Sequence, residues 1–363
     1  MNVPLRIDVV IDNHNYDRYL RTAIDSALAQ RGAGDVIVVD DGSTDDSPEI
    51  IRSYGGRVTA VFKENGGQAS ALNAGWAVSR SGVVIFLDAD DVLLPDAVER
   101  VARAFAATPA AVKVQYRMMV IDGSGTPTGE VMPPAHVHLP TGDLRRSELT
   151  FPFDLPWMAT SGNAFAADAL RRIMPIPEQE FAASADWYLR HVVSLLGEVV
   201  SLSDICACYR VHDSNSYARA GTSIDMAKIR ATVRFAAATQ RHLMRVADEV
   251  GLAPAPRPIL SVADLGNRLI SKKLDPDAHP LADDRVSRLA VDGAIAAVRR
   301  FDVRWPKKLV FIGWFAATAL APRRACGTLA GIFLFPERRP RVGRLLGRLA
   351  GRRRTAQGSA AHE

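Results

Sequence analysis

Short apolar runs alternate with helical stretches along the first third of this chain, and this alternation is the feature that most limits its possible folds. The apolar runs cover residues 5–11, 35–39, 58–62 and 83–87, and polar turn residues bound each of them, as is typical of buried strands. Helical patterns occupy residues 17–29, 68–79 and 97–108, and a further helix starts at Ser47. Four such repeats predict a parallel sheet with right-handed crossovers and a ligand site at the carboxyl ends of its strands.

The regular alternation ends near Val112. Residues 112–210 contain mixed strands, a stretch rich in proline and glycine at 123–140, and a helix near 186–196. Residues 225–300 have mainly helical spacing, interrupted by prolines between 254 and 258. The pattern of predicted secondary structure therefore changes twice along the chain.

Polar clusters follow the first and second predicted strands. Residues 12–16 read Asp-Asn-His-Asn-Tyr, and residues 40–45 read Asp-Asp-Gly-Ser-Thr-Asp. Carboxylates at this sheet edge can accept hydrogen bonds from a nucleobase imide or from ribose hydroxyls. The alternative is that each cluster only makes a tight turn and caps a helix.

A denser acidic cluster follows the fourth predicted strand. Asp88, Asp90 and Asp91 place three carboxylates within four positions, directly after four apolar residues. Carboxylates so close repel one another unless a cation neutralises them. Oxygen ligands of this kind suit Mg²⁺ or Mn²⁺, with diphosphate oxygens completing the coordination. A solvated acidic loop is the alternative.

Taken together and in this order, these stretches resemble the family 2 glycosyltransferases of GT-A fold. The resemblance runs from Leu5 to about Ser216, and the matching stretches are residues 9–16, 38–45, 65–67, 73–75, 88–91, 160–163, 184–189 and 209–215. Two positions depart from the family pattern: His14 stands where many members have an aromatic residue, and Ala185 interrupts the usual acidic pair before Asp186. The resemblance implies an α/β fold, a GT-A type Rossmann-like sheet with helices on both faces, followed by a helical C-terminal region.

The resemblance also implies a role for each matching side chain. It implies that Asp186 is the general base, that Asp90 binds a divalent metal, and that His212 reaches the metal or the diphosphate. It implies that Asp41 accepts a hydrogen bond from the base imide, and that Asp88 holds the ribose or a metal-bound water. The residues implied to contact the donor are Asp12, Asn15, Asp41, Gly67, Asp88, Gly162 and Asn163.

Each of these residues has an ordinary structural alternative. Asp186 could simply be one of the acids that are favoured in the first turn of a helix by its dipole. His212 could simply be a histidine at the end of a strand that makes an ordinary hydrogen bond. Gly162 and Asn163 also suit a simple turn before a helix.

The implied function is inverting transfer of a sugar from a nucleoside-diphosphate sugar to a hydroxyl acceptor, with Mn²⁺ or Mg²⁺ as cofactor, in the synthesis of a cell-surface polysaccharide or a glycolipid. The alternative is a catalytically degenerate sugar-nucleotide-binding or membrane scaffold protein. Residues 12–15 lack the glycine-rich, basic loop of nucleotidyltransferases, and no Gly-x-Gly-x-x-Gly motif follows the first strand, which argues against a dehydrogenase.

On this basis we expect three regions. A GT-A catalytic domain would span residues 1–220, with a nucleotide-binding half at 1–110 and an acceptor-facing half at 111–220. A helical region would follow at 221–304. A membrane-associating apolar and basic segment with a tail would complete the chain at 305–363.

Charge supports this last expectation. The net charge of +5 conceals a basic segment, because residues 299–354 hold 15 Lys and Arg against two acids, which leaves −8 for the rest of the chain. A mildly acidic body with a basic, apolar end favours an anionic membrane surface over nucleic acid as a partner.

The apolar runs 309–321 and 327–335 are each shorter than the ~20 residues of a spanning helix. They suit a shallow hairpin or a pair of interfacial helices, or else core helices of the protein. Beyond them, Arg344, Arg348 and Arg352 recur every four residues beside leucines, the pattern of a surface-bound helix.

The location follows from two further observations. The N-terminal residues lack the basic and apolar pattern of a secretory signal, and Cys206, Cys208 and Cys326 have no metal-site or disulfide-framework spacing. We therefore expect reduced thiols in a cytoplasmic protein at the inner face of the cytoplasmic membrane, with a lipid-linked or saccharide acceptor.

Overall fold

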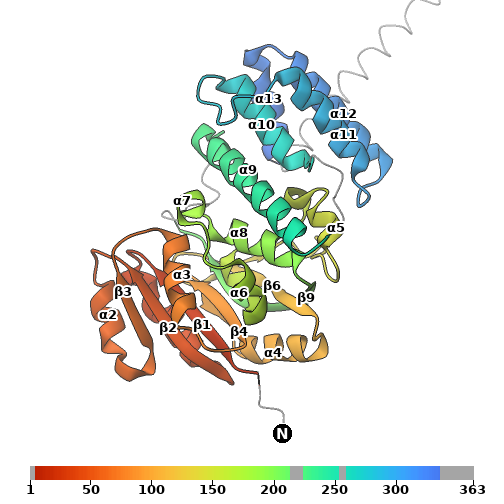
Figure 1. The fold of residues 1–363 in the computed structure, drawn as a ribbon. Coiled ribbons are helices and arrows are strands. Elements are labelled where there is room, and N and C mark those ends of the chain that lie inside the picture. The colour runs from red at the N-terminus through yellow and green to blue at the C-terminus, as the bar shows by residue number, and fades with distance from the viewer. Residues whose placement is uncertain (1–4, 213–223, 253–258, 336–363) are drawn as a thin grey trace, which may run out of the picture. The chain divides into compact units, whose positions relative to one another are not determined.

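The computed structural model describes residues 5–212, 224–252 and 259–335, and it divides into two compact units (Figure 1). The first unit comprises residues 1–218 and 234–259, and the second comprises residues 219–233 and 260–363. One helix, α9 (Met226–Glu249), contributes its beginning to the second unit and its remainder to the first. The predicted boundaries at residues 220 and 304 stay predictions.

The alternation predicted for the first 110 residues is confirmed, with ends that differ by at most two residues where both ends were predicted. The strands are β1 (Ile7–Asn13), β2 (Ala33–Asp41), β3 (Thr59–Lys63) and β4 (Val83–Asp88), all parallel to their neighbours in the order β3-β2-β1-β4. The helices are α1 (Asp17–Leu28), α2 (Ser47–Ser53), α3 (Gln68–Val78) and α4 (Ala97–Ala107).

The second half of the sheet is mixed, as expected from the change near residue 112. β8 (Asn163–Ala166) lies antiparallel to β4, and β6 (Ala111–Ile121) lies antiparallel to β8. β9 (Glu198–Arg210) runs parallel to β6, while β5 (Val92–Leu93) and β7 (Pro127–Met132) pair antiparallel with β9 and β6 respectively. The order of the main path is therefore β3-β2-β1-β4-β8-β6-β9-β5.

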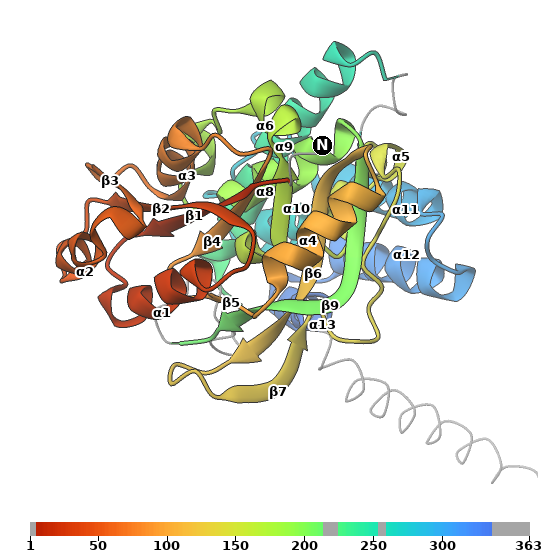
Figure 2. The same cartoon turned by 90° about the horizontal axis from the view of Figure 1, so that it is seen from below.

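Helices cover both faces of the sheet, which explains why the central strands β1 and β4 are buried along almost their whole length (Figure 2). On β1, Val9 and Ile11 point into a core shared with α1, α2 and α4, whereas Val10 points into a core shared with α3. This second core also contains residues of α6 (Ala167–Ile173), α7 (Glu178–Phe181), α8 (Ala185–Val192) and the later part of α9, beside the short α5 (Arg145–Glu148). The predicted α/β fold class is confirmed.

The second unit is wholly helical over its described residues. It contains α10 (Val262–Leu274), α11 (Val286–Arg299), α12 (Trp305–Leu320) and α13 (Arg323–Leu334) around one apolar core. Gly293 of α11 allows this packing, because a Cβ atom there would lie 2.3 Å from the ring of Phe315 on α12.

The two apolar C-terminal runs thus form α12 and α13, and both contribute to the core of this unit, where Trp314 stacks on Phe333 with ring centroids 4.2 Å apart. Within the described ranges, no helix has the length and apolar character needed to cross a bilayer. The basic helix predicted around Arg344 to Arg352, and residues 213–215 of the family-like motif, lie outside the described residues.

Candidate functional site

The predicted acidic clusters meet at one edge of the sheet. Because β1 and β4 are parallel neighbours in register, Asp12 lies directly opposite Asp88 where both strands end. The carboxylate oxygens of Asp88, Asp90 and Asp91 lie within 4.8 Å of one another. Four carboxyl groups therefore share one small region.

Burial makes this arrangement costly for charged carboxylates. It raises the pKa of Asp12 to about 7, with a further contribution from the charge of Asp90. It also raises the pKa of Asp88, Asp90 and Asp91, and neighbouring acids add to the rise for Asp88 and Asp91. Oδ1 of Asp12 and Oδ2 of Asp91 are buried and have no hydrogen-bond partner among the described residues. A divalent cation fits this set, because it would neutralise the carboxylates and satisfy the orphaned oxygens.

The two predicted metal ligands lie together. Nε2 of His212 is 2.9 Å from Oδ2 of Asp90, and both side chains are at most 10% exposed. The ring of His212 packs on Tyr19 and edge-on against Tyr16, with centroids 4.8 and 5.6 Å apart. Two tyrosines near the start of α1 thus hold the imidazole beside the acidic cluster.

Arg210 is a contributor that the sequence did not single out. Its Nε donates to the main-chain carbonyl of Asp90 at 2.8 Å, and its main-chain N–H donates to Oδ1 of Asp91 at 2.9 Å. The side chain is buried, with its guanidinium over the ring of Tyr19. Arg210 therefore fixes the acidic loop after β4 from the end of β9.

Asp41 occupies the centre of a second network. Its Oδ1 accepts hydrogen bonds from Nζ of Lys63 at 2.5 Å and from the Gly66 N–H at 3.0 Å, and its Oδ2 accepts one from the Gly67 N–H at 2.7 Å. Gly67 has φ +83°, and a Cβ atom there would lie 2.6 Å from the carbonyl oxygen of Ala182. In this structure Asp41 shapes the loop before α3, and its contact with a base stays a prediction.

Asn15 links the loops after β1 and β2. Its side-chain oxygen accepts a hydrogen bond from the Thr44 N–H at 2.7 Å, and its own N–H donates to Oγ of Ser43 at 2.9 Å. His14 lies beside this link, with Nδ1 2.9 Å from the Asp41 carbonyl. The two polar clusters therefore form one connected wall.

Gln68 joins the acidic cluster to the predicted base. Its side-chain N–H donates to Oδ1 of Asp88 at 3.0 Å, while its carbonyl accepts from the Ala185 N–H at 3.2 Å. Asp186 is the next residue, in the first turn of α8, and its Oδ2 accepts a hydrogen bond from Arg190 at 2.9 Å. One glutamine on α3 thus ties the helix that carries Asp186 to the strand that carries Asp88.

The predicted residues Gly162 and Asn163 belong to a tight turn beside Asp88. The Asp88 N–H donates to Oγ of Ser161 at 3.0 Å, and the amide of Asn163 donates to the Ala159 carbonyl at 2.6 Å. A Cβ atom on Gly162 would lie 2.9 Å from Cβ of Met158. These contacts place the turn next to the acids, and the predicted donor contacts of both residues stay predictions.

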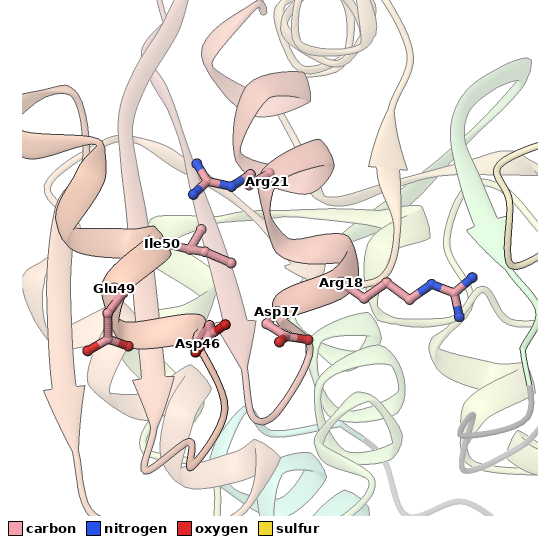
Figure 3. A pocket seen from close by; sticks show the side chains of 6 residues that line it. All are labelled: Asp17, Arg18, Arg21, Asp46, Glu49 and Ile50. Carbon is pink, nitrogen blue, oxygen red and sulfur yellow. The ribbon is translucent and has the colours of Figure 1, made fainter.

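A separate hollow of about 640 Å³ lies between the first turns of α1 and α2 (Figure 3). Its lining is mixed in charge and includes none of the predicted site residues: Asp17, Arg18, Arg21, Asp46, Glu49 and Ile50. This hollow is therefore not the candidate site, whose residues are connected by the hydrogen-bond networks at the sheet edge.

The geometry brings together Asp12, Asp41, Asp88, Asp90, Asp186 and His212, while the roles given to them stay predictions. Lys63, Gln68 and Arg210 join them through contacts between distant parts of the chain. Arg190 joins them through a contact within α8. Such a site can hold a divalent cation and a phosphate-bearing ligand, and it offers one carboxylate, on Asp186, that can accept a proton.

Comparison with known proteins gives matches to glycosyltransferases. Residues 8–154 match the family described as glycosyl transferase family 2. An uncharacterized glycosyltransferase of Nostoc sp. is 34% identical over 246 residues, which is 63% of this chain and 72% of that protein. The hyaluronan synthase of Pasteurella multocida is 39% identical over 128 residues, which is 34% of this chain and 13% of that protein.

Among solved structures, TarS of S. aureus (residues 1–349, in complex with UDP) has a similar fold. The TM-score is 0.51 at 14% sequence identity, and the alignment covers 91% of each chain. This likeness extends over both units of the sequence and supports the assignment of the fold.

Proposed function

This chain belongs to glycosyl transferase family 2, and from that premise we propose that it transfers a sugar, with inversion, from a nucleoside-diphosphate sugar to an acceptor hydroxyl. The observation that carries the proposal is the link through Gln68, which places Asp186 next to the acidic cluster of Asp88. Inverting transfer requires the general base to lie near the site of the leaving diphosphate, because the activated acceptor oxygen and the leaving group are on opposite sides of one carbon.

The donor would lie along the ends of β1, β2 and β4. Asp12 and Asp41 would line the base and ribose pocket, and Asp88 would hold the ribose or a metal-bound water. Asn15, Gly67, Gly162 and Asn163 would form the surrounding wall through the loop contacts described above. TarS of S. aureus was also solved in complex with UDP-GlcNAc, so UDP-sugars are the first donors to test.

Asp90 and His212 would hold Mn²⁺ or Mg²⁺. When bound, such a cation supplies positive charge that stabilises a leaving diphosphate. The orphaned oxygens of Asp12 and Asp91 and the raised pKa values of the acidic cluster support this assignment.

Asp186 would act as the general base. Its carboxylate would take the proton of the acceptor hydroxyl while that oxygen forms a bond to the anomeric carbon and the bond to the diphosphate breaks. The ion pair with Arg190 supports this role, because it fixes the direction of the carboxylate.

The acceptor is proposed to be lipid-linked or a saccharide, in the synthesis of a surface polysaccharide or glycolipid. The similarity to a hyaluronan synthase over about a third of the chain supports a polysaccharide product. The basic C-terminal segment supports a cytoplasmic location at the inner face of the membrane, where a lipid-linked acceptor would be presented.

The test compares Asp186→Asn with Asp168→Asn, which changes an exposed acid at the equivalent first-turn position of α6. UDP-, GDP- and dTDP-sugars are first screened for Mn²⁺-dependent thermal stabilisation. Donor hydrolysis, in which water replaces the acceptor, is then measured for the best donor. We expect Asp186→Asn to bind the donor within about threefold of wild type but to hydrolyse it ~10²–10⁴-fold more slowly.

Asp168→Asn should match the wild type in both measurements. Equal turnover by the Asp186 variant would refute the general-base assignment. Donor binding by the wild type without hydrolysis or transfer would favour the degenerate binding protein instead.

A further inference from the structure

Exposed apolar side chains are concentrated in one part of the second unit. Of the 12 large apolar residues that are exposed within the described ranges, eight lie between Val291 and Leu320. Protein surfaces routinely expose single apolar residues. A concentration of this kind marks a surface that binds another protein or a membrane.

α11 presents an apolar stripe on the side opposite its core face. Val291, Ile295 and Val298 recur at intervals of four and three residues, and they are 59%, 38% and 45% exposed. Gly293 and Ala296 on the same helix point into the core of the unit. The helix is therefore apolar on two opposite faces, and only one of them is buried within the unit.

α12 is apolar around its whole circumference after its first turn. Trp314 and Phe315 fill the core, while Trp305, Leu309 and Val310 are 60%, 61% and 68% exposed. A helix that is apolar on every side is normally buried in protein or in lipid.

Cations border these apolar side chains, and no acid accompanies them on α12 or α13. Residues 303–335 contain five Lys or Arg and no Asp or Glu. Nζ of Lys308 donates to the Val298 carbonyl at 2.7 Å and lies 5.2 Å from the ring centre of Trp305. This ammonium therefore lies between α11 and α12, at the edge of their exposed apolar residues.

We propose that the outer sides of α11 and α12 form a lipid-docking face that inserts into the interfacial region of an anionic bilayer. This face is defined by Val291, Ile295, Val298, Trp305, Leu309 and Val310. Apolar side chains, a tryptophan and bordering cations are the combination that binds helices flat on anionic lipid. The proposal adds α11 to the segment predicted at 305–363 and does not depend on the transfer reaction.

Charge favours lipid over a second copy of the chain as the occupant. If two copies met through this face, Lys307 and Lys308 of each would approach like charges. No acid lies on α12 or α13, and the acids on α11 and just before α12, Asp292 and Asp302, already pair with Arg288 and Arg300. The headgroups of anionic lipids attract the same lysines, so binding to such a bilayer is favourable for each of them.

The experiment uses the full chain and vesicles of phosphatidylcholine with about 30% phosphatidylglycerol, measured by co-sedimentation. Leu309→Gln/Val310→Gln should lower the partition coefficient about tenfold, because two apolar side chains no longer enter the interface. Val291→Gln/Ile295→Gln should act in the same direction from α11. The matched control is Phe62→Gln/Ile205→Gln, which changes exposed apolar residues of the first unit and should leave binding unchanged.

A second pair of variants tests the charge. Lys307→Gln/Lys308→Gln should lower binding to the anionic vesicles about tenfold or more. Arg31→Gln/Arg172→Gln, which removes two exposed cations of the first unit, should have little effect. Vesicles of phosphatidylcholine alone should bind the wild type weakly and should not distinguish the lysine variant from it.

Unchanged melting temperatures would show that the variants fold, as expected for exposed positions. The proposal is overturned if the Leu309/Val310 variant binds vesicles as the wild type does, since the basic charges would then account for all binding. It is also overturned if the wild type is a dimer in sedimentation equilibrium without lipid and the same variant is a monomer, because the face would then join two copies.

Discussion

Asp90 is held at two of its atoms by residues from the end of β9. His212 contacts its carboxylate and Arg210 contacts its main-chain carbonyl, so the position of this acid depends on a strand that is more than a hundred residues away in the sequence. Arg210 also binds the carboxylate of Asp91 through its N–H. It is therefore a positioning residue for the candidate metal site.

We expect Arg210→Lys to weaken Mn²⁺ binding by roughly 10–100-fold, because a residue that orients a metal ligand has effects of this size and lysine cannot reproduce the Nε contact. Isothermal titration with Mn²⁺ measures the change. Arg117→Lys is the matched control, since Arg117 lies on the adjacent strand β6 and binds only carbonyls of residues 133–137 in the contacts described. Equal Mn²⁺ affinity in the two variants would contradict the role of Arg210.

At the scale of single residues, the sequence predicts the acidic side chains of the candidate site better than the residues that hold them in place. The positions of Asp12, Asp88, Asp90 and Asp186 could be predicted, because each lies at the end of a strand, just after one, or in the first turn of a helix. The importance of Gln68 and Arg210 comes instead from hydrogen bonds to residues 20 and 120 positions away. No local pattern specifies such partners.

Between elements, the pairing of β1 with β4 makes the stability of the protein depend on pH. Burial raises the pKa of Asp12 to about 7, above the value near 4 of an unfolded chain. The folded state then binds more protons than the unfolded state between these values, so stability falls as pH rises through this window. The effect ends about one pH unit above the folded pKa, where the carboxylate is ionised in both states.

We therefore expect chelator-treated protein to lose about 1 kcal/mol of unfolding free energy from this group between pH 6 and pH 8. Urea unfolding at the two pH values measures the loss. Asp12→Asn should reduce it, and saturating Mn²⁺ should remove it because the cation replaces the protons. A loss of the same size in the Asn variant would show that other groups cause the pH dependence.

The order of the strands shows where prediction from sequence stops. The first four strands and their helices follow from apolar runs of the right length. The signal is strong in β1, β2 and β4, which are buried over most of their length. The insertion of β8 between β4 and β6 has no such signal. It depends on residues 163–166 reaching back to pair with β4, a contact that only tertiary structure specifies.

Across the whole molecule, the candidate catalytic chemistry and the proposed lipid-docking face belong to different compact units. All of the predicted site residues lie in the first unit, whereas α10 to α13 form the core of the second. Deleting residues 305–363 would also remove Trp314 and Phe315 from that core, so a truncation would unfold the unit as well as remove its surface. Point substitutions can separate the two functions.

We expect Phe315→Ala to destabilise the second unit by about 3–5 kcal/mol, because it empties the space beside Gly293 in the core of that unit. At a temperature where the variant remains folded, donor and Mn²⁺ affinities should equal those of the wild type, since Asp12, Asp90 and Asp186 are all outside this unit. Thermal melts followed by titration at 10–15 degrees below the lower transition measure both properties.

Phe165→Ala is the matched control for this separation. Phe165 is a buried phenylalanine of the first unit, on β8 next to β4, and it packs on Phe86 with ring centroids 6.0 Å apart. Its loss should lower both stability and donor affinity, because β4 carries the acids to the sheet edge. If Phe315→Ala weakened donor binding as much as Phe165→Ala does, the chemistry could not be assigned to the first unit alone, and the second unit would have to act on the site.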